Sequence, residues 1–192
     1  MIELFEINLR NNTSILLKFK NSNGVCIALC YNNYASDITQ VTSGRNGAVM
    51  KYLLLVSHGT FAPGLHSVMD MLMGPRENIL SYSMEDGVGA GEYVKNLSKI
   101  LEPLTADDEV VVLGDIIGGS PLTNALDLLA KKGLLSHTVA FSGANLPMAI
   151  GALMAIDDGL SGEALVSSIL DEGKNGVSQI VLALDDEDEE DL

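Results

Sequence analysis

The sequence has no tryptophan, only two cysteines and only eleven lysines and arginines among its 192 residues. Cys26 and Cys30 have no histidine close by in the sequence, so a zinc site is not predicted and two reduced thiols are the simpler interpretation. No apolar run reaches the roughly 18 residues that cross a bilayer. The first ten residues also lack the basic and apolar blocks of a signal peptide. These absences favour a cytoplasmic protein with an aliphatic core and no metal.

Positive charge is scarce, since 26 acidic residues give a formal net charge of −15. Seven of the last eight residues, 185–192, are Asp or Glu, which predicts a solvated, disordered tail. The rest of the chain is still acidic. Nucleic-acid binding needs basic patches that neutralise phosphates. We therefore expect no nucleic-acid partner, and a role at a membrane surface is disfavoured for the same reason.

Residues 1–49 differ in composition from the rest of the chain, because they hold eight of its thirteen asparagines. Apolar runs at 15–17 and 25–29 indicate short strands, but no long amphipathic period appears. The apolar run that follows Met50 is typical of a first strand behind a start methionine. We hypothesise that residues 1–49 are an upstream extension that is not translated in the cell. The alternative is a real but loosely folded accessory segment.

Apolar runs and helix-boundary residues alternate regularly over residues 50–184. Strands are expected at 52–56, 79–82, 109–113, 138–141 and 179–184, and helices at about 64–73, 91–101, 121–131, 147–154 and 162–172. Strands that are apolar on both faces and alternate with helices indicate a parallel sheet that is covered on both sides. We predict an α/β fold, a doubly wound parallel sheet with helices on both faces.

Residues with chemical potential follow the ends of these strands, where ligand sites form in doubly wound sheets. His58 follows the first strand, with Gly59 beside it to permit close approach. Asp115 ends a later strand, where a carboxylate without a partner would be costly and where His58 would supply that partner. Gly118-Gly119-Ser120-Pro121 then brings the main chain to a helix N-terminus, which favours an anion.

Together these residues predict phosphoryl transfer to a histidine. Neutral imidazole is nucleophilic near pH 7. A carboxylate bonded to its other ring nitrogen fixes the tautomer and stabilises the positive charge that develops. The catalytic residues are predicted to be His58 and Asp115, and the phosphate-binding residues Ser120, Gly118, Gly119 and Gly59. Ser120 is also a candidate helix cap, and the two roles are compatible.

Other chemistries fit less well. A Ser-His-Asp hydrolase needs a nucleophile elbow of the Gly-x-Ser-x-Gly type, which the sequence lacks. Neither a Walker loop nor a Gly-x-Gly-x-x-G fingerprint occurs, which disfavours nucleotide-binding kinases and dehydrogenases. His66 lies on the first helix, facing either the site or solvent, and His137 is expected to be exposed. Neither has a second metal ligand at useful spacing.

Three motifs resemble those of a known family. They are Val56-Ser57-His58-Gly59, Gly118-Gly119-Ser120-Pro121 and Gly143-Ala144-Asn145-Leu146-Pro147-Met148. In this order and spacing they look like the enzyme IIA component of the mannose/fructose/sorbose family of the phosphoenolpyruvate-dependent sugar phosphotransferase system. The resemblance covers residues 50–184 and does not touch residues 1–49. Phe61 departs from the family pattern and would alter the partner surface.

The resemblance implies a phosphocarrier that needs no cofactor. His58 would accept a phosphoryl group on Nε2 from the phosphorylated carrier protein HPr and pass it to a separate IIB component. Nδ1–H would face Asp115, and Ser120 would contact the phosphoryl group. The membrane components IIC and IID would bind the sugar, so their link to this chain is indirect. Family members are homodimers in which the last strand, here 179–184, pairs antiparallel with the partner's sheet.

Two alternatives stay open. The phosphocarrier subunit of dihydroxyacetone kinase has the same fold and also uses a histidine after its first strand. A regulatory binding module of this fold would never be phosphorylated. The Gly-Gly-Ser-Pro and Asn-Leu-Pro-Met motifs favour the sugar-transport branch, although this sequence does not specify the sugar.

Overall fold

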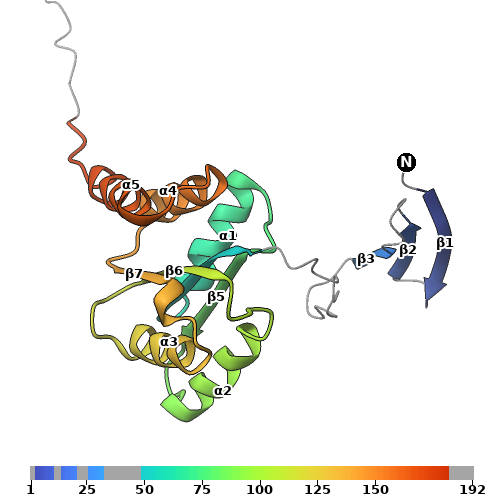
Figure 1. The fold of residues 1–192 in the computed structure, drawn as a ribbon, viewed down its shortest axis with the longest axis horizontal. Helices are drawn as coiled ribbons and strands as arrows, with labels where there is room; N and C mark the ends of the chain where they lie inside the picture. Colours follow the sequence, from blue (N-terminus) through green and yellow to red (C-terminus); the bar gives the residue numbers. More distant parts are fainter. Residues whose placement is uncertain (1–2, 11–13, 21–25, 33–48, 182–192) are drawn as a thin grey trace, which may run out of the picture. The chain divides into compact units, whose positions relative to one another are not determined.

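The computed structural model describes residues 3–10, 14–20, 26–32 and 49–181 (Figure 1). The chain divides into two units, Met1–Ala48 and Val49–Leu192, which are described separately. The predicted acidic tail at 185–192 lies outside the described residues.

The first unit holds a three-stranded antiparallel sheet in the order β1-β2-β3. Its strands are β1 (Glu3–Arg10), β2 (Ser14–Lys20) and β3 (Cys26–Asn32). The apolar runs at 15–17 and 25–29 fall on β2 and β3, apart from residue 25, which lies outside the described residues. β1 was not predicted, because its sequence ELFEINLR interleaves polar and apolar residues and contains no long apolar run.

The second unit is built on a parallel four-stranded sheet in the order β5-β4-β6-β7. Its strands are β4 (Lys51–His58), β5 (Ile79–Met84), β6 (Glu109–Gly114) and β7 (Thr138–Ser142). Val56 of β4 lies opposite both Tyr82 and Gly114. The central strands β4 and β6 are buried on both faces, which explains their unbroken aliphatic sequences.

Helices cover both faces of this sheet. Leu53 and Leu55 pack against α1, α4 and α5, whereas Leu54 and Val56 pack against α2 and α3, because successive strand residues point to opposite sides. The helices are α1 (Phe61–Met73), α2 (Ala90–Ile100), α3 (Ser120–Lys131), α4 (Leu146–Asp157) and α5 (Gly162–Asn175), with a short 3₁₀ helix η1 (Leu135–His137) before β7. Figure 1 shows this layered arrangement.

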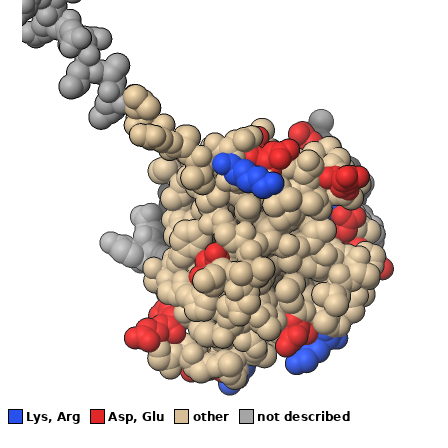
Figure 2. All heavy atoms as spheres, turned by 90° about the vertical axis from the view of Figure 1, so that its left-hand side faces the viewer, with Lys and Arg blue, Asp and Glu red and all other residues tan. Residues whose placement is uncertain are grey.

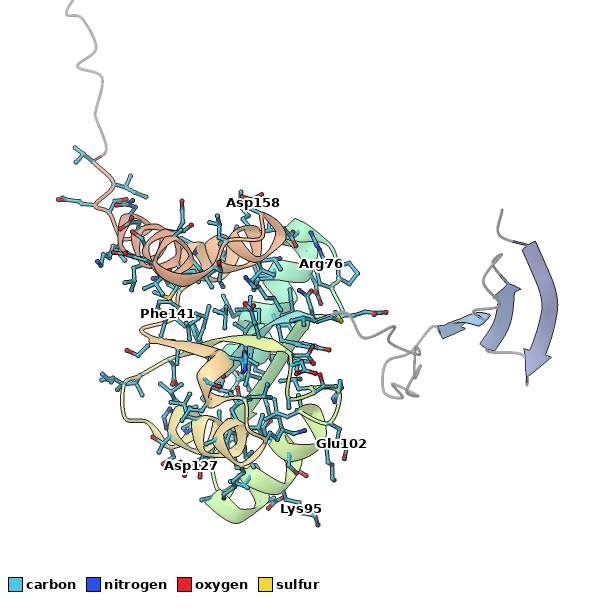
Figure 3. All side chains as sticks on the ribbon, in the orientation of Figure 1. Arg76, Lys95, Glu102, Asp127, Phe141 and Asp158 are labelled. Carbon is cyan, nitrogen blue, oxygen red and sulfur yellow. The ribbon has the colours of Figure 1, made fainter. Side chains whose placement is uncertain are left out.

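Charged side chains lie on the outer surfaces of these layers. Lys95 of α2 and Asp127 of α3 are exposed and point away from the sheet (Figure 3), whereas Phe141 of β7 is part of the core that β7 shares with α4. Arg76, in the connection after α1, pairs with Asp157 at the end of α4, with 3.1 Å between Nη2 and Oδ2. Within the described ranges, no helix combines the length and apolar character needed to cross a membrane.

The predicted order of strands and helices is confirmed from β4 to α5, with small differences at the element ends. The predicted strand at 179–184 lies only partly within the described residues. Residues 179–181 are exposed and not in a strand, and residues 182–184 lie outside the described residues. A strand needs a neighbour that completes its hydrogen bonds.

Candidate functional site

The candidate site lies where the two central strands end. His58 is the last residue of β4, and Asp115 comes directly after β6. The register sets Val56 opposite Gly114, so the residues that follow leave the sheet side by side. The aliphatic sequences that make β4 and β6 the centre of the sheet therefore also bring the imidazole and the carboxylate to the same edge.

His58 and Asp115 are in direct contact. The Nδ1 atom of His58 lies 2.9 Å from Oδ2 of Asp115, and the main-chain N–H of His58 donates to the same oxygen at 2.8 Å. The other oxygen, Oδ1, accepts from the N–H of Ile116 at 2.8 Å. The structure thus brings together the two residues to which catalytic roles were assigned, and those roles stay a prediction.

The carboxylate of Asp115 sets the tautomer of the neutral ring. Partial burial raises the pKa of Asp115, but hydrogen bonds from the His58 main chain, the His58 ring and the Ile116 amide outweigh burial and hold the pKa below its ordinary value. An ionised carboxylate only accepts hydrogen bonds, so Nδ1 carries the hydrogen in neutral His58. Nε2 then keeps its lone pair. Because the His58 side chain is 48% exposed, a partner molecule can reach the ring.

The loop between β6 and α3 closes over the ring. Gly118 has a positive φ of +71°, and a Cβ at Gly119 would lie 2.8 Å from Cε1 of His58. Gly119 is therefore in van der Waals contact with the imidazole, and only a glycine leaves room for it. Gly119, not Ser120, is the N-cap of α3, which corrects the suggestion that Ser120 caps this helix. Ser120 is the first helical residue and is exposed.

The start of α3 lies beside His58, because its N-cap Gly119 contacts the ring, although Pro121 in its first turn contributes no N–H. The first amides of a helix have no acceptor within the helix, and the helix dipole is positive at this end. The hydroxyl of buried Tyr93 donates to the carbonyl of Pro121 at 3.3 Å and so ties α2 to this turn. Burial raises the pKa of Tyr93, which keeps the hydroxyl protonated as a donor.

Two of the predicted phosphate-binding amides already have acceptors. Gly59, with φ +59°, donates its N–H to the carbonyl of Met84 at 2.9 Å, and Gly119 donates to the carbonyl of Ile116 at 3.3 Å. Their contribution is therefore to shape the main chain around the ring. Gly118, in the loop, and Ser120, the first residue of α3, are both exposed, and their roles toward phosphate stay a prediction.

The loop between β7 and α4 supports Asp115 from behind. Gly143 donates its N–H to the carbonyl of Asp115 at 3.2 Å, and Ala144 donates to the carbonyl of Gly114 at 3.0 Å. Asn145 caps α4 by accepting from the N–H of Met148 at 3.0 Å. The third motif of the sequence thus holds the main chain that carries the Asp115 carboxylate.

Sequence reasoning missed a pair of buried serines below the histidine. Ser57 is 0% exposed and Ser83 is 6% exposed, and their hydroxyl oxygens lie 2.8 Å apart. Ser57 appears in the motif Val56-Ser57-His58-Gly59 as a polar residue at the end of an aliphatic run, but the sequence assigned it no role. The contribution of Ser83 depends on the pairing of β5 with β4, which one sequence does not reveal.

The other histidines lie outside the site. His66 is half-buried on α1, with Nδ1 at 2.9 Å from the hydroxyl of Ser81 and Nε2 at 3.5 Å from Asp70. His137 ends η1 and is exposed. Among the described residues, no group of three His, Cys, Asp or Glu side chains is arranged to hold a metal ion.

Exposed apolar side chains follow both site residues in the chain. Phe61, three residues after His58, is 44% exposed, and Ile116 and Ile117, which come directly after Asp115, are 56% and 81% exposed. Figure 2 shows the side of the molecule on which the loop between β6 and α3 runs. Most of this face is uncharged, with Lys or Arg side chains in its upper part and at its lower edge.

Comparisons with known proteins agree on one family. The profile of the family described as "PTS system fructose IIA component" matches residues 52–170, where PTS denotes the phosphotransferase system. The mannose-specific EIIAB component of Escherichia coli K12 is 30% identical over 128 residues, which are 67% of this chain and 39% of that protein. The fructose-specific EIIA component of Bacillus subtilis is 25% identical over 101 residues, 53% of this chain and 67% of that protein.

A solved structure supports the fold. The mannose/sorbose-specific IIA subunit from Enterococcus faecalis has a TM-score of 0.57 and 24% identity, and the match covers 71% of this chain and 98% of that one. The chain spans 39% of the length of the E. coli relative. The family profile covers most of this chain, including His58, Asp115 and the loop between β6 and α3. The chain belongs to the family of PTS system fructose IIA components.

Proposed function

We propose that this protein is a phosphohistidine carrier of a sugar phosphotransferase system. His58 accepts a phosphoryl group from phosphorylated HPr and passes it to a separate IIB component. The observation that carries the proposal is the bond of 2.9 Å between Nδ1 of His58 and Asp115. This bond leaves Nε2 as the nucleophile on a side chain that is half-exposed.

Each transfer exchanges one N–P bond for another. The Nε2 lone pair attacks phosphorus, and the bond between phosphorus and the donor's histidine breaks with its electron pair returning to the donor ring. Nδ1–H stays on His58, and Asp115 stabilises the positive charge that develops on the ring. The first turn of α3 and the hydroxyl of Ser120 hold the phosphoryl oxygens. Transfer to the IIB component repeats these steps in reverse.

The partner proteins dock on the apolar residues around His58. Phe61, Ile116 and Ile117 present exposed apolar surface, which suits the core of a protein–protein interface. Membrane components IIC and IID take part only through the IIB component. This arrangement fits a protein that works in the cytoplasm.

The carrier is proposed to act as a homodimer. Val177, Ile180 and Val181 are apolar and 77–81% exposed, and a segment of this kind gains by pairing with another sheet. We assign the carrier domain to residues 50–184, with the segment 179–184 antiparallel on the partner's sheet. Residues 1–49 are an upstream extension, and residues 185–192 an acidic tail.

The decisive experiment is phosphorylation with phosphoenolpyruvate, enzyme I and HPr. We expect acid-labile phosphate on the wild type and on His137→Ala, a matched variant at an exposed histidine, but none on His58→Ala. Asp115→Asn should accept phosphate about 10³-fold more slowly or worse, because an amide favours the wrong ring tautomer. A wild type that takes no label from HPr contradicts the proposal. Adding a sugar IIB component or the dihydroxyacetone kinase subunits then separates the two phosphocarrier branches.

A further inference from the structure

Ser57 is a buried hydroxyl at the end of an aliphatic strand. It directly precedes His58, and it is 0% exposed. A buried hydroxyl is costly unless it forms hydrogen bonds. The partners of Ser57 therefore indicate what the residue does.

Three neighbours meet at the Ser57 oxygen. Ala62, in the first turn of α1, donates its main-chain N–H to it at 2.7 Å. Ser57 in turn donates to the carbonyl of His58 at 3.1 Å. A hydroxyl has one hydrogen, so Ser83, whose oxygen lies 2.8 Å away, is the donor in the bond between the two serines. The bonds thus run from β5 and α1 through Ser57 to the main chain of His58.

These bonds complete the attachment of the histidine's main chain. The N–H of His58 donates to Asp115 at 2.8 Å, its carbonyl accepts from Ser57, and the N–H of Gly59 donates to the carbonyl of Met84 at 2.9 Å. The orientation of an imidazole depends on the main chain to which it is attached. Without the bond to its carbonyl, the main chain of His58 would be more mobile, and the ring would no longer meet Asp115 in one orientation.

We propose that Ser57, assisted by Ser83, is a positioning residue for phosphoryl transfer. It fixes the main chain of His58 so that Nδ1 faces Asp115 and Nε2 faces the phosphoryl donor. This inference rests on the proposed phosphocarrier function. Ser57 is too deeply buried to contact the phosphoryl group or a partner protein, so it acts only through His58.

The test compares three serines in the full-length protein. Ser57→Ala removes the central hydroxyl, Ser83→Ala removes its donor, and Ser57→Thr keeps an oxygen at the same position. Ser81→Ala is the matched control, because Ser81 lies on the same strand two residues before Ser83 and bonds to His66 instead. Phosphoryl acceptance is measured over a range of phospho-HPr concentrations. The ring tautomer of His58 is measured by ¹⁵N NMR, and thermal unfolding shows that each variant is folded.

Ser57→Ala is expected to lower kcat at least tenfold while KM for phospho-HPr stays unchanged, because the docking surface is untouched. Its His58 ring should show a mixture of tautomers, whereas the wild type shows Nδ1–H. Ser83→Ala should have a smaller effect. Ser57→Thr and Ser81→Ala should stay within threefold of the wild type.

Two results overturn the inference. One is a Ser57→Ala protein with wild-type kcat and a wild-type ring tautomer. The other is a Ser81→Ala protein that loses as much activity as Ser57→Ala, since the effect then comes from general loosening of β5. A wild type that accepts no phosphate contradicts the carrier function instead. In that case the tautomer measurement still decides whether Ser57 directs the ring.

Discussion

At the scale of single residues, Gly119 shows how closely the loop encloses the imidazole. A Cβ at this position would lie 2.8 Å from Cε1 of His58 and 2.8 Å from Cγ2 of Ile116. The Ile116 methyl group can rotate away, but the ring is held by Asp115. The neighbouring Gly118 differs, because its φ of +71° strains any other residue although a Cβ there would meet nothing within 4 Å.

This contrast predicts that alanine at these two positions affects different properties, the rate of phosphoryl acceptance at Gly119 and the stability at Gly118. Gly119→Ala should lower the rate of phosphoryl acceptance at least tenfold, because the ring must turn away from Asp115, while stability changes little. Gly118→Ala should keep most of the rate and cost about 1 kcal/mol of stability from the left-handed backbone. Rates and urea unfolding of both variants check this pair. Equal losses of rate would show that the ring does not depend on the space at Gly119.

The pKa of Asp115 predicts how stability depends on pH. Its folded-state pKa lies below the ordinary value, so its contribution is fully present above the unfolded pKa of about 3.9. The contribution is lost as pH falls through the lower, folded pKa. The free energy of unfolding of the wild type should therefore exceed that of Asp115→Asn at pH 6, and the difference should shrink below pH 4. A difference that stays constant from pH 6 to pH 3 would argue against the hydrogen bonds as the cause.

The sequence was sufficient to single out His58 and Asp115, because both follow apolar runs that read as strands of one parallel sheet. Ser57 could not be assigned in the same way, since its partners Ser83 and Ala62 come from another strand and a helix. The N-cap of α3 was placed one residue late because Ser is the commoner cap, and nothing local revealed that Gly119 must fit against a ring. Residues whose role follows from their position at a strand end could be predicted. Residues whose role depends on contacts between distant elements could not.

At the scale of elements, α4 and α5 pack so closely that glycines are needed between them. A Cβ at Gly151 of α4 would lie 2.6 Å from Cγ and 2.7 Å from Cβ of Glu172, and one at Gly173 of α5 would lie 2.5 Å from Cε of Met148. Asn145 adds a bond of 3.0 Å from its side-chain nitrogen to the carbonyl of Gly173. These two helices form one side of the core. The loop between β7 and α4, which bonds to the main chain of Asp115, leads directly into α4.

Two Gly-to-Ala changes in helices should therefore change the free energy of unfolding in opposite directions. Gly151→Ala should destabilise the protein by about 1–3 kcal/mol, because the near end of the Glu172 side chain cannot move without shifting α5. Gly64→Ala in α1 meets open space and should stabilise by about 0.5–1 kcal/mol through helix propensity. Chemical unfolding measures both. A stabilising Gly151→Ala would mean that the two helices are free to separate.

At the scale of the whole molecule, the unit from Val49 onward has its own core on both faces of its sheet. The start of its first strand, β4, is anchored by a hydrogen bond to Asp108. The N–H of Met50 donates to Oδ1 of buried Asp108 at 2.9 Å, and the hydroxyl and N–H of Thr105 donate to Oδ2 at 3.0 and 2.8 Å. A chain that began at Met50 would present an ammonium group to this carboxylate in place of an amide.

We therefore predict that a protein starting at Met50 folds and works like the full chain. Its unfolding midpoint and its rate of phosphoryl acceptance should match those of the 192-residue protein. Asp108→Ala in the same shortened chain serves as a control and should lower the midpoint, because several donors lose their acceptor. Failure of the shortened chain to fold would assign residues 1–49 to the folded domain.

The scarcity of positive charge bears on the free energy stored in the phosphorylated carrier. A phosphoryl group would bring about two negative charges to a protein of net charge −15, beside ionised Asp115 and on a face that is mostly uncharged. In the proposed carrier, the amides of α3 and the Ser120 hydroxyl would hold such a group without neutralising it. A phosphorylated protein of this kind would keep a high phosphoryl-transfer potential and would act as a relay rather than a store.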